Sequence, residues 1–402
     1  MFYTEHGNLL KRGKVKYLKI VFVSNYFNHH QKPFCEELYH RLGNDFVFVS
    51  TSIMREERKK LGYSYNELPI YVILSHKGPL QRQKALTLIN TADVVIVGSA
   101  PNDMIFERIR AGKLVLRYSE RPYKKKPTLF KKLYCLIRFR QRDLWRKSIY
   151  MLCASAYTAC DFTSAGMYKN CAYKWGYFPE TKHYDIKNLL EEKKKTHILW
   201  CGRFLNWKHP DDVIRAAKKL RDEGYLFTLD FIGTGVMEEE LQNIVNEYSL
   251  DNCVSFLGSM NPSEVRCHME KAGIYLFTSD KQEGWGAVLN ESMNSGCAVV
   301  ASHAIGSVPF LLENNKNGLI YRSGDVDMLY EKIKYLLDNP SEQVRMGKAA
   351  YETITKLWNA NVAAERAIKL SEKILSGDKH PNLYENGPCS RAEIIKDDWF
   401  LG

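Results

Sequence analysis

Residues 274–291 read IYLFTSDKQEGWGAVLNE, an apolar run followed by a loop with two glycines and a second apolar stretch. The run at 274–277 has the length and composition of a buried strand. The segment 286–295 has helical spacing, and Gly296 is the residue type that most often follows the end of a helix. We therefore predict a strand, a glycine loop and a helix in this order.

The same order of elements recurs along the chain. In the first half, a helical pattern begins at Pro33, and runs rich in Val, Ile and aromatic residues predict strands at 18–24, 46–51, 94–98 and 114–118. A second series, starting at residue 197, predicts strands at 198–201, 228–232, 254–256, 274–277, 298–301 and 318–321. Its predicted helices are 211–223, 238–248, 262–271, 286–295 and 326–337. Such alternation is typical of a parallel sheet covered by helices on both faces.

Two such series predict two domains, because a chain of 402 residues is too long for one ordinary core. We predict an α/β fold in which two Rossmann-like parallel-sheet domains face each other across a cleft. The predicted parts are a first domain at 1–180, a linker at 181–196, a second domain at 197–360, and a C-terminal helix and irregular tail at 361–402. Open α/β sheets bind ligands beyond the carboxyl ends of their strands, so we expect the site in that cleft.

The composition excludes several classes of protein. Hydrophobic residues make up 45% and charged residues 26% of the chain, which excludes disordered and fibrous proteins. Ten cysteines without a CxxC pair are typical of reduced thiols, and not of a disulfide framework or a zinc site. No stretch approaches the roughly 18 apolar residues of a membrane-spanning helix, and none has the core of a signal peptide. We therefore expect a cytoplasmic protein.

The net charge of +12 is unevenly distributed, with +18 on residues 1–190 and −6 on the remainder. Residues 121–147 hold eleven Lys or Arg and one acid, with leucines and aromatic residues at helical spacing. A basic amphipathic helix of this kind favours peripheral attachment to an anionic membrane, here at its inner face. The alternative is a packed helix with a solvated basic face. Nucleic acid is a third option that no recognised motif supports, so we expect no nucleic-acid partner.

The segment 283–291 carries the most specific chemistry. Gly284 and Gly286 allow backbone to approach a ligand closely, and the amides of a helix start favour a phosphate. Glu283 precedes the turn, and Glu291 lies about one and a half helical turns beyond Gly286. One carboxylate can meet a sugar and the other can meet ribose hydroxyls. Alternatively both acids are ordinary residues near a helix start, but the glycines and the preceding strand favour the binding interpretation.

A second segment ends a strand at Gly202 and presents Arg203 and Lys208 before the next helix. A guanidinium and an ammonium on one loop can neutralise a diphosphate leaving group without a metal. The alternative is two solvated loop cations, which is the commoner position of any single Lys or Arg.

Other segments give weaker signals. Residues 229–238 contain GxG after a strand but lack the third glycine of the dinucleotide fingerprint, so NAD is not predicted. The loop 301–309 can offer backbone N–H groups, and the loop 25–33, with two histidines and a glutamine, either touches a ligand or is solvated. Asp325 and Asp327 open a helix and are predicted to cap it. We expect no metal and no other cofactor.

In this order and spacing, the segments of the second half resemble the retaining glycosyltransferases of family 4, which have the GT-B fold. The resemblance covers about 160 residues, from 198 to 357. It includes Gly-Arg-x4-Lys at 202–208, Glu-x7-Glu at 283–291 and the run NSGCAVVA at 294–301.

This resemblance implies roles for the candidate residues. Arg203 and Lys208 would bind the donor diphosphate, Glu283 would contact the donor sugar, and Glu291 would hold the ribose. Gly258 would lie near the base. The backbone that would cradle sugar and phosphate is that of Gly284, Trp285, Gly286 and Ala287.

The first half matches this family less well. Relatives often have a histidine near the end of the strand that corresponds to 114–118, where this chain reads Ser119-Glu120-Arg121. Glu120 can take the place of that histidine beside the reacting sugar. The resemblance also implies front-face transfer with retention, in which the leaving phosphate helps to deprotonate the acceptor.

We therefore expect a retaining, hexosyltransferase-type enzyme that uses a nucleotide-diphosphate sugar as donor. Its acceptor would be a glycan or a lipid-linked molecule in the synthesis of a surface polysaccharide or glycolipid. The alternatives are a nucleotide-sugar epimerase of the same fold and a non-catalytic, membrane-associated scaffold. An idle scaffold has no need to keep charged groups at the four positions Arg203, Lys208, Glu283 and Glu291.

Overall fold

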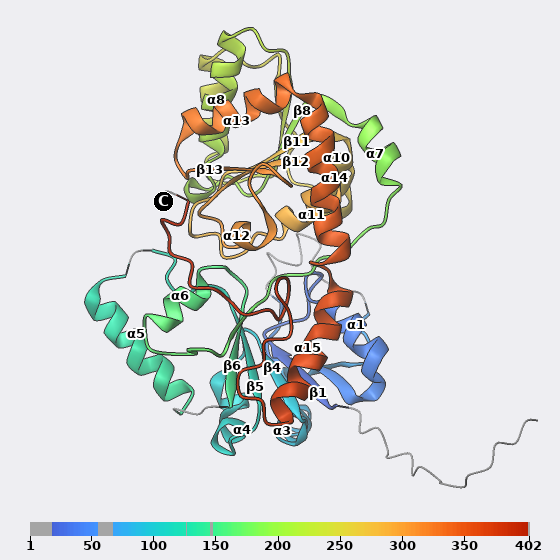
Figure 1. The fold of residues 1–402 in the computed structure, drawn as a ribbon, viewed down its shortest axis with the longest axis vertical. Coiled ribbons are helices and arrows are strands. Elements are labelled where there is room, and N and C mark those ends of the chain that lie inside the picture. Colours follow the sequence, from blue (N-terminus) through green and yellow to red (C-terminus); the bar gives the residue numbers. More distant parts are fainter. Residues whose placement is uncertain (1–17, 55–66, 126, 145–147, 401–402) are drawn as a thin grey trace, which may run out of the picture.

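The computed structural model describes residues 18–54, 67–125, 127–144 and 148–400. The described strands form two parallel sheets, one in each half of the chain (Figure 1). The strand order is β3-β2-β1-β4-β5-β6-β7 in the first sheet and β10-β9-β8-β11-β12-β13 in the second. Each sheet starts at an interior strand and is extended to both sides, so its strand order reverses where such folds bind ligands. The predicted α/β class with two parallel-sheet domains is confirmed.

The strands are short and apolar because helices cover both faces of a parallel sheet. The first sheet contains β1 (Ile20–Ser24), β2 (Phe46–Ser50), β3 (Val72–Leu74), β4 (Val94–Val97), β5 (Val115–Ser119), β6 (Ile149–Cys153) and β7 (Ala172–Lys174). The second contains β8 (Lys194–Cys201), β9 (Thr228–Ile232), β10 (Val254–Phe256), β11 (Ala272–Phe277), β12 (Ala298–Ser302) and β13 (Leu319–Tyr321). The sequence did not predict β3, β6 or β7, and β8 begins inside the predicted linker.

Helices connect the strands in both halves. Those of the first half are α1 (Lys32–Leu42), α3 (Pro79–Thr91), α4 (Phe106–Arg110), α5 (Leu129–Arg142) and α6 (Thr158–Thr163). The next are α7 (Ile186–Glu192), α8 (Pro210–Asp222), α9 (Glu238–Glu247), α10 (Pro262–Lys271) and α11 (Val288–Asn294). The last are α12 (Val308–Leu311), α13 (Val326–Asp338), α14 (Pro340–Lys356) and α15 (Ala360–Leu375). Among the described helices, none combines the length and hydropathy needed to cross a membrane.

Local sequence explains several helix ends. Asn261 and Glu264 form a capping box at the start of α10, with Pro262 in its first turn. Asp325 accepts from the Met328 amide at 2.9 Å, so it caps α13 as predicted. The predicted helix start at Gly286 is wrong, because Gly286 has φ 78°, in the left-handed region, and α11 begins two residues later.

The two domains share a continuous core. The buried Trp285 of the second domain packs near Tyr177, which follows β7 of the first domain, with ring centroids 6.3 Å apart, and near Trp358 at 6.0 Å. A Cβ on Gly176 would overlap with the Trp285 ring, so the chain after β7 passes directly against it. The last helix, α15, lies beside α1 of the first domain, and the chain then runs back to end between the two domains (Figure 1).

Candidate functional site

Most of the predicted site residues of the second domain lie in the loops that follow β8 and β11, whereas Gly258 follows β10 and Glu291 lies on α11. The short 3-10 helix η4 (Asn206–Lys208) leads into α8, and hydrogen bonds join it to the loop after β11. The Thr278 hydroxyl donates to the Lys208 carbonyl at 2.7 Å, and the Asp280 amide donates to the Trp207 carbonyl at 2.9 Å. The buried Trp200 indole donates to the Thr278 hydroxyl at 2.9 Å. These bonds hold the two loops in one fixed arrangement.

Lys208 and Glu283 form an ion pair across these loops. Both side chains are only 13% exposed, and the Ser279 hydroxyl donates to the same Glu283 oxygen at 3.3 Å. The Lys208 ammonium also lies 4.7 Å from the centre of the Trp207 ring. The structure thus brings Lys208, which is predicted to bind the diphosphate, into direct contact with Glu283, which is predicted to contact the sugar.

Glu291 lies on α11 and is half-buried. Among the described residues, none donates a hydrogen bond to its carboxylate. Burial raises the pKa of Glu291 to about 7, and the charge of Arg266 counteracts that rise in part. Burial also raises the pKa of the Cys201 thiol to about 12; the charge of Glu291 adds to this rise and that of Lys208 opposes it. Glu291 and Lys208 therefore both lie around the carboxyl end of β8.

Arg203 and Gly258 lie in the neighbouring loops. The Arg203 side chain is exposed, and no described residue bonds to it. Gly258 follows β10 with φ 72°, and its carbonyl accepts from the Gly233 amide at 2.8 Å. The loops after β8, β9 and β10 are therefore adjacent, but the structure does not pair Arg203 with Lys208.

The GxG at 233–235 has a packing role. A Cβ on Gly233 would overlap with the Gly202 carbonyl, and a Cβ on Gly235 would overlap with the Phe204 carbonyl. These two glycines let the loop after β9 pack on the backbone that carries Arg203. From sequence alone, this motif indicated only that NAD is not predicted, and its packing role was missed.

The glycine loop at 284–287 contains backbone amides that do not bond within the described part of the chain. Among the described residues, no carbonyl or side chain accepts from the amides of Gly284, Trp285 or Gly286. A Cβ on Gly286 would overlap with the Phe277 ring, and Gly286 has a positive φ. Both features require glycine at this position. The Trp285 side chain points into the core, where its indole donates to Asn290 at 2.9 Å. Only the backbone of Trp285 is thus available for the predicted cradle.

The Glu120 carboxylate of the first domain lies against this loop. A Cβ on Gly284 would overlap with the Glu120 carboxylate and with the Lys124 ammonium. Glu120 accepts hydrogen bonds from the Tyr177 hydroxyl at 2.7 Å and from Lys124 at 2.6 Å. Sequence reasoning missed Lys124 and Tyr177. Lys124 lies in the stretch that was interpreted as a membrane surface, and no local pattern marks Tyr177.

The loop after β12 supports the glycine loop. The Gly306 amide donates to the Glu283 carbonyl at 3.1 Å, and the Ser307 hydroxyl donates to the Trp285 carbonyl at 2.5 Å. The Ala156 amide of the first domain donates to the Gly306 carbonyl at 2.8 Å. In the loop 301–309, which was predicted to offer backbone N–H groups, the Gly306 amide is therefore bonded within the protein. In the loop 25–33, the His30 ring stacks on Tyr177 at 5.8 Å, beside Glu120.

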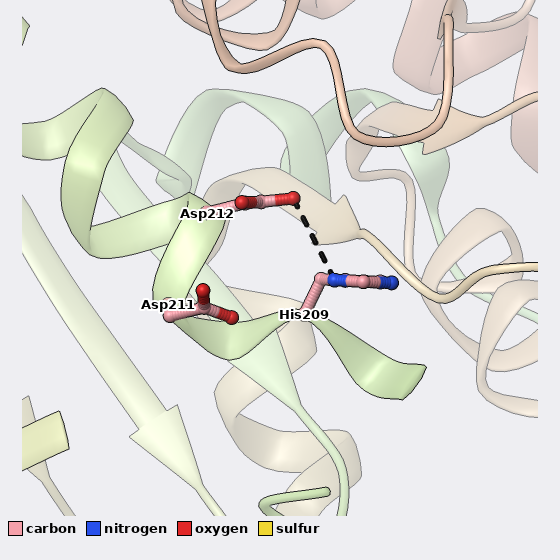
Figure 2. Close-up of side chains that lie close together, drawn as sticks. All are labelled: His209, Asp211 and Asp212. Atoms are coloured by element: carbon pink, nitrogen blue, oxygen red, sulfur yellow. Dashed lines mark ion pairs between the residues drawn. The ribbon is translucent and has the colours of Figure 1, made fainter. Parts of the chain in front are cut away.

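Figure 2 shows His209 and Asp212 facing one another at the start of α8, with Asp211 beside them. Their ligand-type atoms lie within 4.8 Å of one another, a spacing that can hold a metal ion. Arg215 already pairs with Asp211 at 3.0 Å and with Asp212 at 3.2 Å, and His209 also lies 3.7 Å from Asp280. A hydrogen bond to Asp280, together with the nearby carboxylates, raises the pKa of His209. These contacts favour a role in holding the loop next to Lys208.

The basic segment predicted at 121–147 includes α5, a helix without a buried residue. Leu129, Phe130, Leu133, Tyr134 and Ile137 form an apolar stripe along it and are 51–86% exposed. The exposed cations beside that stripe are Lys131, Lys132 and Arg138. Residues 126 and 145–147 lie outside the described part of the chain.

Comparison with known proteins agrees with this geometry. Residues 182–353 match the model of the family described as Glycosyl transferases group 1, so the second half contains a domain of that kind. Over 206 residues the chain is 25% identical to the amylovoran biosynthesis glycosyltransferase AmsK of Erwinia amylovora, covering 50% of each chain. A GDP-mannose-dependent phosphatidylinositol monomannoside mannosyltransferase of Mycobacterium tuberculosis is 24% identical over 42% of this chain and 45% of its own. The chain thus spans about half the length of the curated relatives it matches.

The fold of the whole chain has counterparts among solved structures. The Anabaena protein Alr3699/HepE, solved in complex with UDP, superposes with a TM-score of 0.64 at 16% identity. That superposition covers 89% of this chain and 100% of the Anabaena chain. At this identity the likeness shows the fold alone, and the fold is GT-B.

Proposed function

We propose that this protein is a retaining glycosyltransferase with the mechanism of family 4. It would move a hexose from a nucleotide-diphosphate sugar to a glycan or lipid-linked acceptor in the synthesis of a surface polysaccharide or glycolipid. The observation that carries the proposal is the meeting of the two domains at the glycine loop. Lys208 and Glu283 pair beside the carboxyl ends of β8 and β11, with Glu291 nearby on α11, and the Glu120 carboxylate of the first domain lies against Gly284.

On the donor side, Lys208 would exchange Glu283 for the diphosphate, and the exposed Arg203 would close over the same group. Glu283, released from the ion pair, would accept hydrogen bonds from the sugar. Glu291 would accept from the ribose, and the base would lie near Gly258. Two cations supply the charge that a departing diphosphate needs, so the proposal requires no metal or other cofactor.

On the acceptor side, Glu120 would lie beside the reacting sugar, oriented by Tyr177 and Lys124. The bond from the anomeric carbon to the diphosphate would break while the bond to the acceptor oxygen forms on the same face. The acceptor proton would pass to the departing phosphate, so the configuration is retained. The relatives' names support this class of reaction, because they include amylovoran biosynthesis and mannosyl transfer to a phosphatidylinositol glycolipid.

A nucleotide-binding panel tests the proposal. We expect UDP or GDP and the corresponding sugar nucleotide to raise the melting temperature by roughly 5–10 °C at 100 times the Kd, because ligand binding then adds about 2.7 kcal/mol. The stabilising sugar nucleotide should release nucleoside diphosphate only when a saccharide or lipid-linked saccharide is added. NMR of the product should show the anomeric configuration of the donor. Isomerised sugar without released diphosphate would indicate an epimerase, and no stabilisation by any nucleotide would contradict the donor site.

We also propose that α5 binds the inner face of an anionic membrane, as a peripheral and cytoplasmic attachment. The exposed apolar stripe supports this over a packed helix, because five large apolar side chains gain nothing from water. The neighbouring cations would lie at the level of the lipid headgroups. The acceptor cleft is close to this surface along the chain, since only four residues separate Lys124 from the start of α5.

Lipid vesicles test this attachment. The variant Lys131→Gln/Lys132→Gln/Arg138→Gln should bind vesicles of 40% phosphatidylglycerol about 100-fold more weakly than the unmodified protein. Each basic residue near such a surface contributes about 1 kcal/mol, and three are removed. The matched control Lys271→Gln/Lys348→Gln/Lys379→Gln removes three cations from elsewhere on the chain and should bind almost unchanged. Equal loss in both variants would mean that net charge, and not α5, drives binding.

A further inference from the structure

The segment after α15 is a part of the fold that the sequence predicted only as an irregular tail. It runs antiparallel along β7, where the Cys389 amide donates to the Lys174 carbonyl and the Lys174 amide to the Ser390 carbonyl, both at 2.8 Å. The Ala392 amide donates to the Ala172 carbonyl at 3.0 Å. This anchored stretch then leads residues 394–400 into the space between the two domains (Figure 1).

Residues 394–400 contact the first domain next to Glu120. Asp397 accepts a hydrogen bond from the Arg121 guanidinium at 2.7 Å. The Arg121 side chain is only 4% exposed and also pairs with Asp161 at 3.1 Å. The Trp399 indole donates to the Tyr157 hydroxyl at 2.8 Å. Because Arg121 directly follows Glu120, the tail contributes to fixing the backbone that carries this carboxylate.

The same residues contact the second domain at His303. The His303 ring lies 3.3 Å from the Asp397 carbonyl, and the Phe400 ring stacks on it at 5.8 Å. The Tyr157 hydroxyl donates to the His303 carbonyl, which also lies 3.4 Å from the Trp399 indole. His303 begins the loop that holds the Glu283 carbonyl through Gly306. The tail therefore bonds to both domains.

We propose that residues 394–400 form an interdomain strap in which Asp397 and Trp399 are positioning residues for the transfer reaction. The inference rests on the proposed function. The strap ties the loop of Glu120 to the loop that supports Glu283, so it sets the separation of the two carboxylates that face the donor sugar. Transfer depends steeply on that separation, since a misplacement of about 1 Å can lower a rate about 100-fold.

Hydrogen exchange tests the strap without reference to activity. A chain that ends after Glu393 keeps the pairing with β7 and the Lys174–Glu393 ion pair but loses the strap. We expect the amides of 119–124 and 303–308 to exchange at least ten times faster in it, with the β1 and β4 amides unchanged. The double variant Asp397→Asn/Trp399→Phe covers the case in which the shortened chain folds poorly. Asp398→Asn, at a neighbouring exposed carboxylate, is the control and should behave as the unmodified protein.

Transfer kinetics then test positioning. The double variant should lower kcat about 10–100-fold with the KM for the donor changed less than threefold, because Lys208 and Glu291 do not touch the strap. Asp397→Glu should retain more activity than Asp397→Asn, since it keeps the pair with Arg121. Unchanged exchange in both strap variants would overturn the inference. Faster exchange in a protein that shows no transfer in any form supports the strap and contradicts only the proposed function.

Discussion

Replacing Lys208 with methionine should lower the rate of sugar transfer by about a thousandfold and leave the protein folded. Loss of one preorganised group that stabilises developing charge costs about 100–1000-fold, and an ammonium beside a diphosphate belongs at the upper end. Methionine keeps the length of the side chain and its contact with the Trp207 ring. The effect should therefore come from the missing charge, and circular dichroism should be unchanged.

Lys281→Met is the matched control for this prediction. Lys281 lies in the loop after β11, close in sequence to Glu283, and no described residue pairs with it. Its replacement should change the rate by less than twofold. If Lys208→Met retains more than a tenth of the activity, the assignment of Lys208 to the diphosphate is wrong.

The ion pair with Glu283 requires one more comparison. If Lys208 only neutralises Glu283, the variant Lys208→Met/Glu283→Gln should be no slower than Glu283→Gln alone. If Lys208 binds the departing diphosphate, the double variant should lose further activity. Initial rates of all three variants with the donor found in the nucleotide panel distinguish these outcomes.

The parallel fold was predictable because its signal is local. Strands such as β1 and β4 are continuous apolar runs, and each is followed by a turn and a helix. The strands β3 and β7 have three residues each, too few for a pattern to identify. The start of α11 was misplaced because the sequence does not reveal the backbone angle of Gly286.

The candidate site also has a part that the sequence predicts and a part that it does not. Lys208, Glu283 and Glu291 follow strand ends in one domain, so their proximity could be expected from sequence order. The contact between Glu120 and Tyr177 could not be expected, because Tyr177 is 57 positions away, beyond β7. Asp397 is 276 positions from Arg121, and no local pattern links the two. Contacts between domains depend on their packing, about which neighbouring residues carry no information.

Glu291→Gln should make the protein more stable and a weaker binder of the donor. Burial raises the pKa of Glu291 to about 7, whereas an exposed glutamate titrates near 4.3. The folded state therefore holds this proton at a pH at which the unfolded chain has released it. The stability contributed by Glu291 is fully present below the unfolded pKa and is lost as the pH rises to about 7. Glutamine does not ionise, so the variant does not lose this stability at high pH. Because solvent screens a half-buried charge, the difference in the free energy of unfolding is about 1–2 kcal/mol.

The loss of stability on ionisation of Glu291 predicts how the melting temperatures of the two proteins differ with pH. At pH 8, Glu291→Gln should melt about 4 °C above the unmodified protein, since 1 kcal/mol shifts the melting temperature of a domain of this size by about 2–4 °C. At pH 5 the difference should shrink, because Glu291 then carries its proton. Glu240→Gln, at an exposed position of α9, is the control and should show no such pH dependence.

Donor binding should change in the opposite direction. Hydrogen bonds from ribose to a carboxylate contribute about 1.5–3 kcal/mol each, so Glu291→Gln should weaken binding about 50-fold. Binding to the unmodified protein should weaken as the pH falls below 7, by about 50-fold in total once Glu291 is fully protonated, and the variant should lose this dependence. Calorimetry with the intact sugar nucleotide is the suitable measurement, because its diphosphate has no terminal phosphate that titrates in this range.

Higher stability together with weaker donor binding in Glu291→Gln would distinguish a ligand-binding carboxylate from one that stabilises the fold. If a carboxylate stabilises the fold through hydrogen-bond partners, neutralising it makes the protein less stable. Donor binding would then weaken only because a smaller fraction of the protein is folded. Glu291 has no hydrogen-bond partner among the described residues, and its ionisation makes the folded protein less stable. The proposed ribose ligand would explain its placement. A Glu291→Gln protein that is less stable at pH 8, or that binds the donor unchanged, would show that the ribose lies elsewhere.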